Sequence, residues 1–82
     1  MYIDVPEFDG RGLKFVWDEN FFIEFKESYS TFVLKANKAG LMSLARILLE
    51  LAQDSVPVGC HVHLDEFNAL EIDSLELIIS KV

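Results

Sequence analysis

Two histidines and an aspartate alternate along one short stretch of the chain, between Gly59 and Glu66. In a β-strand successive side chains point to opposite faces, so His61, His63 and Asp65 are expected on the same face. Imidazole and carboxylate groups are proper ligands for zinc and related metals. The spacing therefore raises one candidate function, a small metal-binding protein or metal-dependent enzyme that uses these three side chains.

The rest of the sequence offers little that would complete such a site. No second cluster of ligands is visible to close the coordination shell that one strand leaves open. The chain also shows no nucleophile with an adjacent base, no phosphate-binding loop and no basic stripe. We therefore expect no catalytic residue, no metal and no cofactor, and we expect both histidines on a strand surface that faces solvent or a partner.

The charge balance restricts the class of partner. The 82 residues include 14 acidic side chains against 7 lysines and arginines, which gives a formal net charge of −7. Binding to nucleic acid requires a positive surface, so a nucleic-acid ligand is not expected. A basic protein surface is a better match. A chain of this length has room for a single domain, over residues 1–82.

Acidic residues gather in the segment that follows the two histidines. This segment has two interpretations: a solvated loop that keeps the protein soluble, or a docking surface for a basic partner. Trp17 also has two, because a tryptophan packs in cores and also anchors interfaces. The candidate partner-binding residues are Asp65, Glu66, Glu71, Asp73 and Trp17.

Alternating apolar residues and turn residues predict an α+β fold. Three aromatic and β-branched runs precede a helical pattern, and two further runs follow it. Asn37 is the candidate N-cap of the helix, and Pro57 marks the loop that ends it. We expect an antiparallel sheet of about five strands with the helix packed on one face, in the order β-β-β-α-β-β. The expected strands cover residues 13–17, 21–26, 29–35, 59–64 and 75–80.

The helical pattern also predicts which side chains reach the core. Apolar residues recur at helical spacing and define one face. The polar residues Ser43, Arg46, Glu50 and Gln53 are expected to point elsewhere. The predicted core face consists of Leu41, Leu44, Ala45, Leu48, Leu51 and Ala52.

Several predicted strands carry large apolar residues on both faces, which is unusual for a half-exposed sheet. We expect incomplete cover on the face turned away from the helix. The connector between residues 65 and 73, a second copy of the chain in a homodimer, or another partner would then be needed to cover it. A structural subunit that dimerises through this face is a further alternative. The residues expected to be exposed there are Val16, Phe22, Phe32, Leu34 and Ile78.

Location follows from what the sequence lacks. The most apolar segment, residues 41–52, contains Arg46 and Glu50 and is shorter than the roughly 18 to 20 residues that a bilayer requires. The single cysteine, Cys60, cannot form a disulfide within the chain, and the acidic start has no signal-peptide pattern. We expect a protein of the cytoplasm with no membrane contact.

Taken together, these features resemble the immunity protein 32 family of bacterial polymorphic toxin systems. The likeness covers residues 12–82 and rests on Trp17 in the first part of the chain, a helix led by Gly40 and Leu41, and Gly59 before His-x-His-Leu-Asp. A last segment, Leu-Glu-Leu-Ile-Ile, completes it. The resemblance implies an immunity protein, which binds and silences a toxin made by the same cell or its kin. It implies stoichiometric protein contact and not catalysis.

Overall fold

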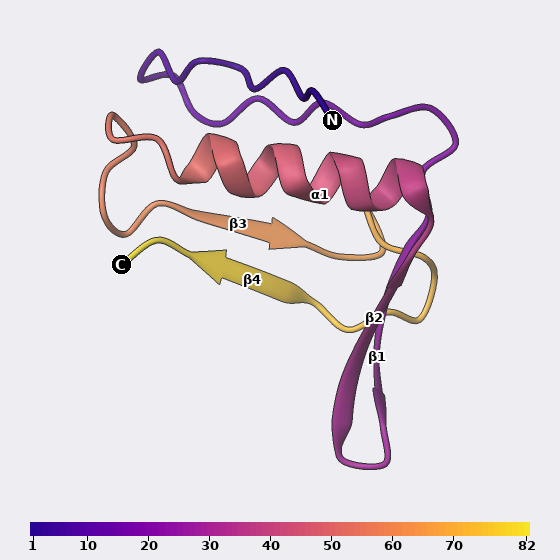
Figure 1. The fold of residues 1–82 in the computed structure, drawn as a ribbon. Coiled ribbons are helices and arrows are strands. Elements are labelled where there is room, and N and C mark those ends of the chain that lie inside the picture. The colour runs from indigo at the N-terminus through magenta and orange to yellow at the C-terminus, as the bar shows by residue number, and fades with distance from the viewer.

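The computed structural model describes residues 1–82 and confirms the α+β class. Figure 1 shows the helix between the N-terminal segment and one hairpin of strands, while the other hairpin projects from the start of the helix. The helix is not long and apolar enough to cross a membrane. The elements are β1 (Ile23–Ser28), β2 (Thr31–Ala36), α1 (Lys38–Leu51), β3 (His61–Leu64) and β4 (Leu77–Ser80).

The four strands form two separate antiparallel pairs, β1 with β2 and β3 with β4, so the predicted single sheet of about five strands is not confirmed. The missing strand is the one expected over residues 13–17. The backbone of this segment, and that of Asp18 directly after it, bonds to helix side chains instead of to a strand. The N–H of Lys14 donates to Oε1 of Glu50, and the N–H of Asp18 donates to Oγ of Ser43 at 2.8 Å.

Polar side chains of α1, together with Gln53 just after its end, hold the N-terminal segment along the helix. Arg46 donates to the carbonyl oxygens of Asp4 and Val16, at 3.1 and 3.0 Å. Gln53 donates from Nε2 to the carbonyl oxygen of Pro6 at 2.8 Å. A segment without secondary structure of its own must satisfy its backbone groups elsewhere, and this row of side chains provides partners for several of them.

The buried face of α1 therefore differs from the predicted one. Ser43 and Glu50, expected to point away from the core, are 0% and 1% exposed, whereas Leu41 and Leu48 are 55% and 47% exposed. The helical period was predicted correctly, but the buried face is rotated by about one residue. The reason is that the N-terminal segment covers the side of the helix that carries Ser43 and Glu50. The buried residues of the helix are Gly40, Ser43, Leu44, Ile47, Glu50 and Leu51.

The junction between β1 and α1 is closely packed. Asn37 is the N-cap, as predicted, and its Oδ1 accepts from the N–H groups of Gly40 and Phe22 at 2.8 and 3.0 Å. Its Nδ2 donates to the carbonyl oxygen of Asn20 at 2.9 Å. A Cβ atom at Gly40 would collide with the carbonyl oxygen of Phe22 and crowd Ile23. Glycine thus allows the helix to start directly against the first strand.

The core lies where α1, the base of β1, the inner face of β3 and the segment after β3 meet. Lys81 closes this region at the C-terminus, because its Nζ donates to the carbonyl oxygens of Gln53 and Val56 at the end of the helix, at 2.7 and 2.9 Å. Cationic side chains commonly satisfy carbonyl groups at this end of a helix. The buried apolar residues are Ile23, Leu44, Ile47, Leu51, Val56, Val62, Leu64, Ala69 and Leu70.

The turn of the first hairpin is at Tyr29 and Ser30, which were predicted to lie within a strand. Their φ angles are 50° and 66°, and the two residues connect Ser28 to Thr31. Positive φ at both central residues is typical of a type I′ turn, whose twist matches that of the two strands it connects. The side chain of Tyr29 is 99% exposed at the tip.

Candidate partner-binding surface

The acidic connector, defined here as residues 65–76, runs from the end of β3 to the start of β4. Asp65 builds its first turn: the carbonyl oxygen accepts from Asn68, Ala69 and Leu70, and Oδ1 accepts from the N–H of Phe67 at 2.9 Å. A carboxylate that caps its own turn in this way fixes the backbone. Asp65 therefore shapes the connector and is itself half-buried.

Three other predicted residues of the connector, Glu66, Glu71 and Asp73, are exposed. Oε2 of Glu66 accepts from the N–H of Asp73 at 2.7 Å, and the N–H of Glu71 donates to the carbonyl oxygen of Ile23 on β1 at 2.8 Å. These bonds tie the connector to itself and to β1. The carboxylates are consequently presented from a backbone with fixed contacts.

No cation of the chain neutralises these groups. The ion pairs of lysine and arginine join Lys14 to Asp9, Lys26 to Glu24 and Arg46 to Asp18, and none involves Asp65, Glu66, Glu71 or Asp73. The connector also contains no lysine or arginine. Its four predicted carboxylates are therefore uncompensated, whereas Glu76 at its end lies beside His63. The hydrogen bond from the N–H of Arg11 lowers the pKa of Asp9, but that carboxyl lies outside the connector.

Trp17 lies at the edge of the core in a row of aromatic rings. Its ring stacks on Phe21 with centroids 4.8 Å apart and faces Phe15 at 6.3 Å. Trp17 is half-buried and packs against the core, so it has a structural role. It also lines a shallow pocket of about 60 Å³ together with Phe15.

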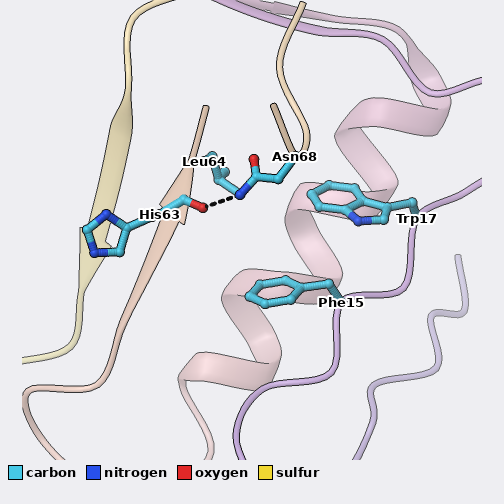
Figure 2. A pocket seen from close by; sticks show the side chains of 5 residues that line it. All are labelled: Phe15, Trp17, His63, Leu64 and Asn68. Atoms are coloured by element: carbon cyan, nitrogen blue, oxygen red, sulfur yellow. Dashed lines mark hydrogen bonds between the residues drawn. The ribbon is translucent and has the colours of Figure 1, made fainter. Parts of the chain in front are cut away.

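The opposite side of this pocket belongs to β3 and the connector. Figure 2 shows Phe15 and Trp17 across from His63, Leu64 and Asn68. Nδ2 of Asn68 donates to the carbonyl oxygen of His63 at 2.9 Å, which joins the connector to the strand. Pockets for small ligands measure about 300 to 1,000 Å³, so this one has room only for part of a side chain. It links Trp17 to the acidic connector within one surface.

The two histidines lie together as predicted, but Asp65 does not join them. The rings of His61 and His63 meet edge to face with centroids 4.9 Å apart, and Nδ1 of His63 lies 3.5 Å from Oε2 of Glu76. The strand ends at Leu64, so Asp65 turns away to cap the next turn. No group of three histidine, cysteine, aspartate or glutamate side chains could hold a metal ion. The alternative site of His61, His63 and Asp65 is therefore not formed.

Sequence reasoning missed part of this surface. Phe15 alternates with Trp17 in the same run, and that spacing indicated a shared face. Asn68 carried no signal, because its position depends on the turn that Asp65 builds. Glu76 was visible as one of the acidic residues near the end of the chain, but its closeness to His63 depends on the pairing of β3 with β4.

Comparison with known proteins gives one result. The family described as Immunity protein 32 matches residues 31–82, which is more than half of the chain and extends from β2 through β4. The match includes the connector and excludes Trp17. No curated protein and no solved structure matches the chain significantly. On this evidence, the chain belongs to the immunity protein 32 family.

Proposed function

We propose that this protein is an immunity protein of the cytoplasm that binds and neutralises a cognate bacterial toxin by stoichiometric contact, without catalysis. Family membership suggests the function. The observation that carries the mechanism is the acidic connector, where four predicted carboxylates have no cationic partner within the chain. A protein with a net charge of −7 and such a surface is suited to a basic target.

The connector acts in two ways in this proposal. Its exposed carboxylates Glu66, Glu71 and Asp73 raise the rate of encounter with a basic surface and then occupy positions that the toxin uses for an anionic substrate. Asp65 holds the turn that presents them. Both effects require negative charge at a fixed place. The hydrogen bonds from the connector to β1 fix the backbone that carries it.

Trp17 contributes an apolar contact beside the charged one. Its pocket with Phe15 and Asn68 accepts part of one side chain of the toxin, and stacked aromatic residues form strong contacts when a partner excludes water from them. Charge then determines the approach, and the pocket determines how long the complex persists.

Growth of cells that express the toxin tests the proposal. The protein encoded beside this chain is expressed alone and with the chain, and purified mixtures are analysed by size exclusion with light scattering. We expect growth only in the presence of the chain, a one-to-one or two-to-two complex, and an unchanged mass for the toxin. Growth arrest despite soluble expression of the chain would contradict the proposal, as would a covalent change in the toxin.

A further inference from the structure

The hairpin of β1 and β2 has one covered edge and one open edge. The covered edge is that of β1, where the N–H groups of Glu71 and Leu75 donate to the carbonyl oxygens of Ile23 and Phe25, both at 2.8 Å. No loop or side chain makes a comparable bond to β2. A six-residue strand edge is long enough to pair with another strand.

The register of the hairpin shows which groups the open edge presents. Because a two-residue turn joins Ser28 to Thr31, this pair is hydrogen-bonded, and the pairs alternate from there. Phe32 and Leu34 are opposite Glu27 and Phe25 in pairs that are not hydrogen-bonded. Their N–H and C=O groups consequently point away from β1, towards solvent.

One face of this edge strand carries apolar side chains. Phe32 and Leu34 share one face of the hairpin with Ile23 and Phe25, and Phe32 stacks on Phe25 with centroids 6.0 Å apart. Ile23 at the base is fully buried, whereas Phe32 and Leu34 are 60% and 36% exposed. The hairpin thus carries an apolar face out of the core and leaves its far part uncovered.

We propose that a second copy of this chain pairs with β2 along this edge, in an antiparallel arrangement with its two-fold axis at Val33. In this register Phe32 lies opposite Leu34 of the second copy, and Leu34 lies opposite Phe32 of the second copy. Both pairs are hydrogen-bonded, so every outward N–H and C=O group of these two residues gains a partner. The interface is the same patch on both copies, as a two-fold dimer requires.

In the same register, the side chains that lie opposite each other across the dimer are compatible. On the apolar face each row of the four-stranded sheet reads Glu27, Phe32, Leu34 of the second copy and Phe25 of the second copy. The apolar strip therefore becomes continuous across the dimer. On the polar face Thr31 lies opposite Lys35 of the second copy, so no like charges face each other across the interface.

The distribution of charge favours pairing at the open edge of β2 over pairing at the outer edge of β4. Within β1 and β2, Glu24 and Glu27 balance Lys26 and Lys35, so the hairpin has no net charge and the net charge of −7 lies in the rest of the chain. The strand β4 directly follows the acidic connector, and Glu76 is the residue before it, so its outer edge lies next to negative charge in the sequence. Two acidic copies approach each other with the least repulsion at their neutral hairpins.

A pair of charge variants at Thr31 tests both the edge and the register. Molar mass is measured by light scattering over a range of concentrations, and we expect a concentration-dependent dimer for the unmodified chain. Thr31→Lys sets like charges opposite each other twice in the dimer and should weaken it about tenfold, whereas Thr31→Glu should tighten it by a similar factor. The residue is exposed, so both variants keep the monomer fold.

A proline pair tests the backbone bonds. Leu34→Pro removes an outward N–H that the dimer needs and should therefore give a monomer. The fold should survive, because this N–H makes no bond to β1 and proline is tolerated where a strand faces solvent. Ile78→Pro makes the matched change on the open edge of β4 and should leave the dimer intact. Circular dichroism checks the fold of both variants. A monomer at every concentration for the unmodified chain overturns the proposal. So does a dimer that responds equally to the two members of either pair.

Discussion

The two hairpins have the same architecture but opposite relations to the core. β3 and β4 lie flat against the helix, and Val62 and Leu64 are each 1% exposed. From the base of β1 to the turn of its hairpin, exposure rises from 0% at Ile23 to 99% at Tyr29. Figure 1 shows the difference directly, since the β1–β2 hairpin projects beyond the rest of the molecule. One hairpin stabilises the fold, and the other displays a surface.

The attachments of the hairpins differ in the same way. The β3–β4 pair is continued by bonds between Cys60 and Lys81, and Lys81 also reaches the end of the helix. The β1–β2 pair is held at its base, through Asn37 and Gly40, and along one edge by the connector. Changes at the base are therefore expected to affect the whole fold, and changes near the tip are not.

The two hairpins should differ most at two leucines, Leu64 in β3 and Leu34 in β2. Leu64→Ala empties a fully buried site and should lower the free energy of unfolding by about 2 to 5 kcal/mol. Leu34→Ala removes a half-exposed side chain and should cost less than about 1 kcal/mol in dilute solution. Urea unfolding of both variants measures the difference. Equal losses would mean that the projecting hairpin is packed as tightly as the other.

The next effect concerns the base of the projecting hairpin. Gly40→Ala places a methyl group against the carbonyl of Phe22 and the side chain of Ile23, and we expect a loss of about 1 to 3 kcal/mol. An exposed helix position such as Leu49→Ala serves as control, because alanine is a good helix former. Thermal unfolding should separate the variants clearly. An unchanged melting temperature for Gly40→Ala would show that helix and strand are not closely packed.

A smaller effect is expected at the N-cap. Asn37→Ala removes the acceptor for Gly40 and Phe22 and should cost about 0.5 to 2 kcal/mol. Asn37→Asp keeps the acceptor but loses the donor to Asn20, so it should recover part of the stability. Denaturation of both variants tests this order. If the aspartate variant is no better than the alanine variant, the cap bond is not the main contribution.

The sequence predicted the helix and its cap because period and capping depend on local residue types. It also predicted exposure for Val16, Phe22, Phe32, Leu34 and Ile78, and all five are exposed, although the single sheet on which they were expected is not formed. It failed where distant segments compete. Residues 13–17 alternate like a strand, but their backbone groups bond to the side chains of Glu50 and Arg46. Side chains that bond to a backbone far along the chain leave no local pattern.

Only part of the candidate surface could be predicted from the sequence. Composition alone indicated the acidic connector, because charge is visible without a structure. The pocket of Phe15, Trp17 and Asn68 was not predictable, since it depends on how the N-terminal segment lies beside β3. The metal hypothesis failed at Asp65 because the strand ends one residue earlier and the carboxylate bonds to the next turn.

We propose that the acidic connector draws the toxin to this protein. Two variants lose four negative charges each: one replaces Asp65, Glu66, Glu71 and Asp73 by asparagine or glutamine, and the matched control replaces four exposed acids elsewhere. The control positions are Asp4, Glu7, Glu19 and Asp54.

The decisive measurement is the association rate constant with the toxin as a function of ionic strength, after circular dichroism has shown that both variants are folded. We predict a rate for the unmodified chain and the control that falls steeply with salt, and a slower rate with little salt dependence for the connector variant. Equal rates for the two variants at every salt concentration would contradict the claim and place the contact elsewhere.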